Sequence, residues 1–264
     1  MLQPLIIGRG RAGKRHEKLL IDQNIFPSIV DIDSSVKPQF TSLHNALSYH
    51  WRFVVIASPP DAHLEQIRQC LDLDMFVLCE KPLCGWGQLE EARKLLSHPH
   101  ADKLMMAFNY RYNPDIVHKD GTIRLPNVEI YSSQYRESLP SWGLLLDHVP
   151  HDLDILQWRY GDLVVETARV REDEKKHLAI VMGYFLDDGK RYFKIHDEVT
   201  KYPKDRQSYI IDSLGRSEIS ANPLMFMEMY KAFFAFMEGE VGALGLSDGI
   251  KVQEYLEKAR ELSS

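Results

Sequence analysis

The sequence predicts an α/β fold, in which a parallel α/β domain is followed by an α+β domain with a mainly antiparallel sheet. Residues 1–108 alternate short apolar runs with segments of helical period, which is the pattern of a parallel sheet with crossover helices. After Pro114 the apolar runs become β-branched and aromatic, and hairpin signals join them. The 264 residues are enough for two modest domains, which we place at 1–110 and 111–264.

In the first domain we expect five parallel strands joined by right-handed crossovers. The predicted strands are Leu5–Ile7, Ser28–Ile32, Phe53–Ala57, Met75–Cys79 and Lys103–Phe108. The predicted helices are Lys14–Asp22, Leu43–Ser48, Ala62–Asp72 and Gly87–Ser97. This succession of elements is that of a Rossmann domain.

The second domain is predicted to hold five strands and two helices. The predicted strands are Val128–Arg136, Leu163–Arg171, Leu178–Leu186, Arg191–His196 and Gln207–Leu214, with hairpin signals at Asp187–Lys190 and Leu214–Arg216. The predicted helices are Asp147–Tyr160 and Pro223–Glu238. Because Leu224–Met237 is apolar nearly all round, it belongs either to a core or to a subunit interface.

The first strand runs into the sequence Gly8-Arg9-Gly10-Arg11-Ala12-Gly13, a G-x-G-x-x-G turn that opens a helix. Gly8 permits a tight turn, and Gly10 lets the backbone approach a pyrophosphate. Gly13 lets the helix pack closely on the strand, and the amides of its first turn, at Arg11 and Ala12, then face the phosphates. The strand before the turn and the helix after it distinguish this pattern from a plain glycine-rich turn. The sequence therefore predicts a dinucleotide-binding site.

Asp31 stands near the end of the second predicted strand. A carboxylate at this position accepts hydrogen bonds from the hydroxyls of the adenosine ribose. Such a carboxylate favours NAD and repels the 2′-phosphate of NADP, and Asp33 adds to the repulsion. NADP stays open as an alternative, because five basic side chains near the turn could contact a phosphate. These are Arg9, Arg11, Lys14, Arg15 and Lys37.

Composition excludes several classes of partner. The net charge of −6 and the lack of a Lys/Arg block argue against nucleic acid and anionic membranes. No apolar run approaches the roughly 20 residues of a membrane span. The three cysteines form no C-x-x-C pair, and the sequence shows no secretory leader. We therefore expect a soluble cytoplasmic protein with reduced thiols.

Several motifs occur in an order that resembles the Gfo/Idh/MocA family of NAD(P)-dependent oxidoreductases over nearly the whole chain. The glycine turn is followed by His16, the E-K-P element stands at the end of the fourth strand, and a D-x-x-x-H-x-x-D element opens a helix. The matching segments are Gly8–His16, Val55–Pro60 with His63, Cys79–Leu83, Asn109–Pro114, Leu146–Asp154 and Leu246–Lys251.

The resemblance implies catalytic roles for Lys81 and His151, and physical chemistry agrees. Lys81 stands at the carboxyl end of a strand, where open α/β sheets bind ligands, and it can hold a substrate oxygen. Asp147 lies one helical turn before His151 and can orient the imidazole as a general base. Alternatively, Lys81 pairs with Glu80, and Asp147 merely caps an amphipathic helix. The family often has a cis bond before Pro82.

Asp154 and Trp158 lie on the same face of the predicted helix as Asp147 and His151. Asp154 is expected either to brace the helix or to contact the substrate. His148 and His151 are three residues apart, but spacing supplies no third ligand, so we expect no metal.

The resemblance also implies the remaining site residues. Residues expected to contact the cofactor are Gly8, Gly10, Arg11, Ala12, Gly13, Asp31, Ser58, Pro59, His63, Glu80 and Lys81. For His63, capping the next helix or touching the Ser58 loop is the alternative to a direct contact. Residues expected to contact substrate are Lys81, Arg111, Tyr112, His148 and His151.

The expected reaction is hydride transfer between nicotinamide and a carbinol or ketone carbon of a sugar, cyclitol or sugar derivative, in a homo-oligomer. His151 would take the hydroxyl proton while Lys81 polarises the oxygen. Two alternatives remain: a cofactor-binding regulator without turnover, and a non-redox NAD-dependent elimination such as that of related glycosidases. Only 115–146 separates two motifs that lie further apart in typical members, so the sequence leaves substrate class and subunit number open.

Overall fold

The computed structural model describes residues 3–117, 127–136, 142–186, 191–201, 207–212, 215–219, 222–240 and 244–263. The chain divides into two compact units. The first comprises residues 1–108 with 226–250, and the second comprises 109–225 with 251–264. The sequence division at residue 110 placed 226–250 in the second domain, whereas these residues belong to the first unit.

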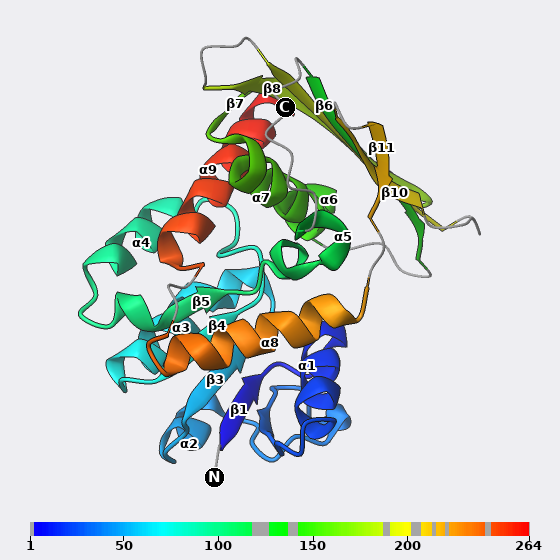
Figure 1. Cartoon of the computed structure of the whole chain (residues 1–264). Helices are drawn as coiled ribbons and strands as arrows, with labels where there is room; N and C mark the ends of the chain where they lie inside the picture. Colours follow the sequence, from blue (N-terminus) through cyan, green and yellow to red (C-terminus); the bar gives the residue numbers. More distant parts are fainter. Residues whose placement is uncertain are drawn as a thin grey trace. The chain divides into compact units, whose positions relative to one another are not determined.

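The first unit contains the predicted parallel sheet (Figure 1). Its five strands run in the spatial order β2-β1-β3-β4-β5, and every neighbouring pair is parallel. Both β1 and β3 are buried along their whole length, as continuous apolar runs in a covered parallel sheet should be. The strands are β1 Pro4–Ile7, β2 Ser28–Val30, β3 Phe53–Ile56, β4 Phe76–Cys79 and β5 Leu104–Met106.

Helices connect these strands. They are α1 Arg11–Ile21, α2 Leu43–Leu47, α3 His63–Asp72 and α4 Leu89–Lys94, with single 3₁₀ turns at Ser34–Val36, Pro60–Ala62, Leu95–Ser97 and Ala101–Lys103. The first helix begins at Arg11, three residues earlier than predicted, because the last part of the glycine turn is already helical. Gly10 is its N-cap.

Helix α8, Leu224–Met237, adds aromatic side chains to the hydrophobic core of the first unit. The ring of Phe53 on β3 lies 5.4 Å from that of Phe233 and 5.9 Å from that of Phe234, and Phe76 on β4 lies 5.6 Å from Phe236. These contacts place the aromatic face of the helix in the core of the first unit, which is one of the two alternatives that the sequence offered.

The second unit is built on a six-stranded sheet in the order β11-β10-β6-β9-β8-β7. All neighbours are antiparallel except β6 and β9, which pair in parallel over nine residue pairs from Asn127↔Tyr192 to Tyr135↔Thr200. The predicted mainly antiparallel α+β unit is thus confirmed. The strands are β6 Asn127–Tyr135, β7 Leu163–Glu172, β8 Lys176–Phe185, β9 Tyr192–Thr200, β10 Gln207–Asp212 and β11 Gly215–Glu218.

The two predicted hairpins join strands that do pair, β8 with β9 and β10 with β11. Their turn residues, 187–190 and 213–214, lie outside the described residues. The helices of this part of the chain are α5 Pro114–Val117, α6 Leu144–Asp147, α7 Val149–Tyr160 and α9 Leu246–Ser263, of which α9 begins in the first unit.

The helix predicted over Asp147–Tyr160 is interrupted at His148. Helix α6 ends at Asp147 and α7 begins at Val149, with His148 at φ −112° and ψ −50° between them. Pro150 explains the interruption, because it has no amide hydrogen to continue the hydrogen-bond ladder and is favoured in the first turn of a new helix. Asp147 and His151 therefore belong to two helices rather than to one stripe.

The glycine turn depends on two close backbone contacts. Gly8 has φ +93°, and a Cβ there would lie 2.8 Å from the Ala57 carbonyl oxygen. A Cβ on Gly13 would lie only 1.9 Å from the Gly8 carbonyl oxygen, so α1 packs directly on the turn. Around Gly10, in contrast, a Cβ would meet nothing within 4 Å. Two glycines are thus required by packing, and one borders open space.

We predict that two alanine substitutions in the glycine turn differ in their effect on stability. Gly13→Ala should lower the free energy of unfolding by about 2 kcal/mol or more, because backbone must move to admit the Cβ. Gly10→Ala should change it by less than about 1 kcal/mol, since the site is open and only an N-cap preference is lost. Urea denaturation followed by circular dichroism compares the two variants. Equal destabilisation by both would show that the Gly8–Gly13 contact does not set the packing of α1.

Candidate functional site

The first unit gathers most of the predicted cofactor residues at one edge of its sheet. Asp31 follows β2, Ser58 and Pro59 follow β3, and Glu80 and Lys81 follow β4. Because the strands are parallel, these residues all stand at the carboxyl edge, together with the glycine turn after β1. This is the edge at which open α/β sheets bind ligands.

Two backbone amides hold the Asp31 carboxylate. The N–H of Arg9 donates to Asp31 Oδ2 at 2.6 Å, and the N–H of Asp33 donates to Oδ1 at 2.8 Å. An ionised carboxylate has about four acceptor positions, so two remain for other donors. The carboxylate is thereby fixed beside the glycine turn, in the place expected for a group that accepts ribose hydroxyls.

The N-terminus of α1 suits a pyrophosphate. The helix has eleven residues, and its first turn carries no acidic side chain. The amides of Arg11, Ala12 and Gly13 form this turn, and the open space at Gly10 gives a dinucleotide access to them. The residues present therefore fit a dinucleotide cofactor.

Glu80 takes part in a buried network that sequence reasoning missed. Its Oε1 accepts from Arg15 Nη2 at 2.9 Å and lies 3.0 Å from His16 Nε2, while His16 Nδ1 lies 2.8 Å from the Tyr230 hydroxyl on α8. Burial opposes the charged form of Glu80, but the hydrogen bond with His16 and the charge of Arg15 outweigh it and hold its pKa well below the usual range. Glu80 thus anchors α1 and α8 to the end of β4.

His63 bridges the two loops after β3 and β4. Its Nε2 lies 2.9 Å from the Ser58 carbonyl oxygen, and its Nδ1 lies 2.9 Å from the Pro82 carbonyl oxygen. Burial lowers the pKa of the imidazole despite these carbonyls. The Lys81–Pro82 bond is cis, as the family resemblance implied. His63 therefore sets the spacing of the Ser58 and Lys81 loops, and this contact matches the alternative that the sequence left open.

In the second unit, His148 and His151 lie close to several polar side chains. The Tyr110 ring packs against the His151 ring with centroids 4.8 Å apart, and the His148 and His151 rings are 6.4 Å apart. Arg136 on β6 contacts Asp147 through Nη1 and lies 2.8 Å from His148 Nε2 through Nη2. Tyr110 was missed at the sequence level, although its position in the N-Y-R segment at a strand end is the signal that could have found it.

Arg111 forms a buried ion pair with Asp154 within the second unit. Its Nε and Nη2 form a fork with Asp154, at 3.0 Å and 2.6 Å from Oδ1, and both side chains are buried. Its guanidinium carbon also lies 5.9 Å from the centre of the Trp158 ring. Of the two roles considered for Asp154, the structure supports bracing of α7. The expected substrate contacts of Arg111 and Tyr112 remain predictions.

Beside the two histidines lies a small chamber of about 10 Å³, lined by residues of β6, β10 and α7. Tyr110, Ser132, His148, His151 and Asp152 are among them. Such a volume is about that of one water molecule. Polar groups on three elements thus converge next to His151.

Two carboxyl groups, Asp152 and Asp197, are buried together in this unit. Oδ2 of Asp152 and both oxygens of Asp197 have no conventional donor within hydrogen-bond distance among the described residues. Burial raises the pKa of Asp197 to about 7, and burial followed by the nearby Asp197 charge raises that of Asp152 well above its usual value. A proton bound by one of the two carboxyls removes the repulsion between two buried negative charges, so the pair should keep a proton to a higher pH than an exposed aspartate does.

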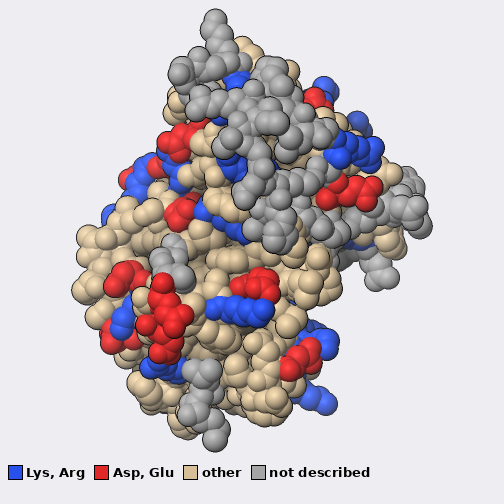
Figure 2. Space-filling model, viewed as in Figure 1, with Lys and Arg blue, Asp and Glu red and all other residues tan. Residues whose placement is uncertain are grey.

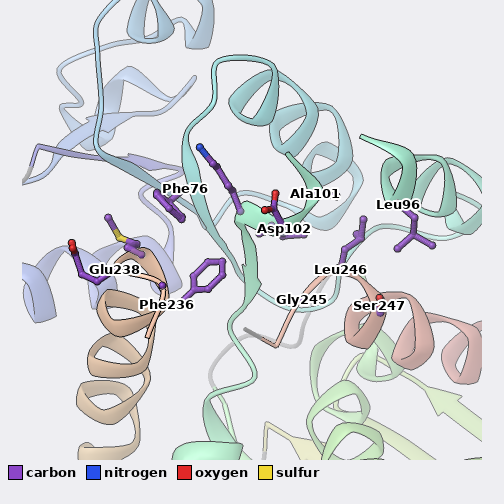
Figure 3. A pocket seen from close by; sticks show the side chains of 13 residues that line it. Phe76, Leu96, Ala101, Asp102, Phe236, Glu238, Gly245, Leu246 and Ser247 are labelled. Atoms are coloured by element: carbon purple, nitrogen blue, oxygen red, sulfur yellow. The ribbon is translucent and has the colours of Figure 1, made fainter. Parts of the chain in front are cut away.

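A hollow in the first unit has no residue of the glycine turn in its lining (Figure 3). It has a volume of about 770 Å³ and is lined by Phe76, Leu104, Phe236 and Leu246 among others. Phe76 begins β4 and Leu104 begins β5, so the hollow is at the amino edge of the sheet, opposite Lys81. It is not the dinucleotide site.

On the face seen in Figure 2, acidic and basic side chains are interspersed. Among the residues that the structure describes, no helix has both the length and the apolar character to cross a membrane.

Residues 2–110 match the Gfo/Idh/MocA family model, which is described as an oxidoreductase family with an NAD-binding Rossmann fold. Over these residues the chain is similar to the Gfo/Idh/MocA oxidoreductase family. The match covers the glycine turn, Asp31 and the E-K-P element, which are the features that the first unit brings to one edge.

Curated relatives and solved structures extend this result. The chain is 26% identical to the uncharacterised oxidoreductase YrbE of Bacillus subtilis over 187 residues, and 26% identical to an inositol 2-dehydrogenase of Rhizobium meliloti over 196 residues. These alignments cover 61% and 64% of this chain, but only 54% and 59% of the two relatives.

The fold of the whole chain is similar to that of a myo-inositol dehydrogenase from Corynebacterium glutamicum, with a TM-score of 0.79 at 18% identity, covering 100% of this chain and 96% of the other. It is also similar to the WlbA dehydrogenase of Thermus thermophilus, solved with NAD and UDP-GlcNAcA, with a TM-score of 0.76 at 19% identity and coverage of 98% and 95%. The likeness in fold to these dehydrogenases therefore extends beyond residues 2–110.

The buried carboxyl pair gives a stability prediction. A raised folded-state pKa means that the folded protein binds more protons than the unfolded chain, so the pair's contribution is fully present below about pH 4 and is lost as pH rises through about 7. Asp197→Asn should remove much of this dependence and raise the free energy of unfolding at pH 8 by about 1–3 kcal/mol.

Urea denaturation at pH 5 and pH 8 measures this effect. The exposed Asp22, replaced by asparagine, serves as the control and should leave the wild-type pH dependence in place, because its partner Lys18 stays charged from pH 5 to pH 8. A wild-type and an Asp197→Asn protein with parallel pH profiles would contradict the proton held by the pair.

Proposed function

We propose that the chain is an NAD-dependent dehydrogenase that transfers a hydride between nicotinamide and a hydroxyl-bearing carbon of a cyclitol, sugar or sugar derivative. The observation that carries the proposal is the family match of residues 2–110, joined to a turn that leaves Gly10 open beside the fixed Asp31 carboxylate. When bound, NAD supplies the hydride acceptor. The amides of α1 would bind its pyrophosphate, and Asp31 would accept the adenosine ribose hydroxyls.

Lys81 and His151 are proposed to act on the substrate hydroxyl. Lys81 stands at the carboxyl edge next to Glu80, whose carboxylate already binds Arg15 and His16. An ammonium group there polarises the substrate oxygen and helps to move its proton. His151, packed against Tyr110, would accept the proton as the hydride leaves. Arg136 links Asp147 to His148, so we propose that Asp147 positions the histidine segment through Arg136 as well as orienting His151.

The substrate class is inferred from similar proteins and from the polar side chains. Two of the reported relatives are named as inositol dehydrogenases, and WlbA was solved with a nucleotide sugar. Tyr110, His148 and His151 lie close together in the second unit, and hydroxyl-rich substrates need several such hydrogen-bond partners. A homo-oligomer remains part of the proposal.

The proposal is tested by following absorbance of the reduced nicotinamide over a panel of cyclitols, sugars and sugar acids with NAD and NADP. We expect NAD to be reduced, seen as a rise in the absorbance of the reduced nicotinamide, as at least one polyhydroxylated substrate is oxidised. Tight NAD binding without turnover on any member of the panel would favour a cofactor-binding regulator instead. Consumption of a glycoside without net change in reduced nicotinamide would favour the elimination mechanism.

On a substrate found in this way, Lys81→Ala and His151→Ala should each lower kcat by about 10²–10⁴-fold, because each removes a group that polarises the oxygen or transfers its proton. The combined loss in the double variant should be smaller than the product of the single losses if both act on one oxygen. Affinity for NAD should change little.

Lys103→Ala and His98→Ala are the matched controls, since these residues pair with Asp74 and Asp72 at the surface. They should retain wild-type kcat. Full activity of His151→Ala would refute the proposed role of this histidine.

A further inference from the structure

The guanidinium of Arg9 is held by α1 and by the loop after β2. Arg9 Nε donates to Glu17 Oε2 at 2.9 Å, and Nη2 donates to Glu17 Oε1 at 2.7 Å. On its other side, Nη1 donates to the Val36 carbonyl oxygen at 2.5 Å and lies 3.3 Å from that of Lys37. Four hydrogen-bond contacts thus use most of the five N–H groups of a guanidinium.

The main chain of the same arginine contacts the carboxylate that would face the ribose. Its N–H donates to Asp31 Oδ2 at 2.6 Å. Such a carboxylate accepts hydrogen bonds from the two hydroxyls of the adenosine ribose in NAD. In NADP a phosphate is attached at the 2′ position, where NAD has one of these hydroxyls. The main chain of Arg9 therefore contacts the carboxylate beside which the 2′-phosphate of NADP would lie. In the structure, however, the Nε and Nη2 groups of the Arg9 side chain already donate hydrogen bonds to another residue.

Glu17 accepts the hydrogen bonds from Nε and Nη2 of Arg9. The paired N–H groups at Nε and Nη2 are the edge of a guanidinium that binds a phosphate through two parallel hydrogen bonds. Glu17 binds this same edge, and its negative charge neutralises the cation. The two side chains are 26% and 19% exposed, so water screens the pair less than a fully exposed one.

We propose that Glu17 is a specificity-determining residue: it withholds Arg9 from the 2′-phosphate of NADP and so adds to the discrimination in favour of NAD that Asp31 exerts directly. This inference rests on one part of the proposed function, namely that the first unit binds NAD, and not on the reaction or the substrate. Together, Asp31 repels the extra phosphate, and Glu17 keeps the Arg9 guanidinium from binding it.

The two contributions are separated by measuring NAD and NADP affinities calorimetrically for the wild type, Glu17→Gln, Asp31→Ser and the double variant. Glu17→Gln alone should have a small effect, because Asp31 still repels the phosphate. In the Asp31→Ser background, Glu17→Gln should tighten NADP binding about tenfold, since a charge-assisted fork becomes available. Within each background, Glu17→Gln should change NAD affinity by less than about threefold, and this retained binding also shows that the variants fold.

A matched control is available on α3. Glu65 forms the same fork with Arg68, at 3.0 Å and 2.6 Å, away from the turn. Glu65→Gln in the Asp31→Ser background should leave NADP affinity unchanged. Adding Arg9→Met to the Glu17→Gln/Asp31→Ser protein should abolish the gain. If Glu17→Gln impairs folding, Glu17→Ala replaces it in the same comparison.

Equal NADP affinities of Asp31→Ser and Glu17→Gln/Asp31→Ser, with NAD binding retained, would overturn the inference. A gain that survives Arg9→Met would overturn it as well. Failure of the wild type to bind either dinucleotide would instead refute the proposed function, so the two failures are distinguishable.

Discussion

The approach of Gly13 to the Gly8 carbonyl oxygen is the constraint on which the rest of the first unit depends. A methyl group at Gly13 would lie 1.9 Å from that oxygen, so α1 can begin this close to β1 only because the position is glycine. The contact fixes the start and direction of α1. Every side chain that α1 contributes further along is placed as a consequence.

Three side chains in the next turn of α1 show this consequence. Arg15 and His16 reach Glu80 at the end of β4, and Glu17 reaches Arg9 in the turn itself. The same helix thereby braces the segment that carries Lys81 and holds the arginine beside Asp31. Binding residues and their supports are thus parts of one packing arrangement, and a shift of α1 would disturb both ends of the dinucleotide site.

The second unit uses buried charge in two different ways. Arg111 and Asp154 neutralise each other through a bidentate pair that braces α7, and breaking such a pair leaves an uncompensated buried charge. Asp152 and Asp197 carry like charges, so burial favours the retention of a proton instead. Both pairs lie on or against the helix that carries His151, which makes the position and electrostatics of this histidine depend on residues outside the motif.

The sequence by itself determined the elements whose cause is local. Continuous apolar runs gave the parallel strands, the glycine spacing gave the turn at the carboxyl edge, and Asp31 followed from its place after β2. The break at His148 was also readable, since Pro150 cannot continue a helix, although the D-x-x-x-H spacing suggested one continuous stripe. Only the tertiary structure decided that α8 packs into the first unit, that Glu80 bonds His16 and Arg15, and that Glu17 binds Arg9. These depend on contacts between residues distant in sequence, and a side chain's charge does not reveal which partner will reach it.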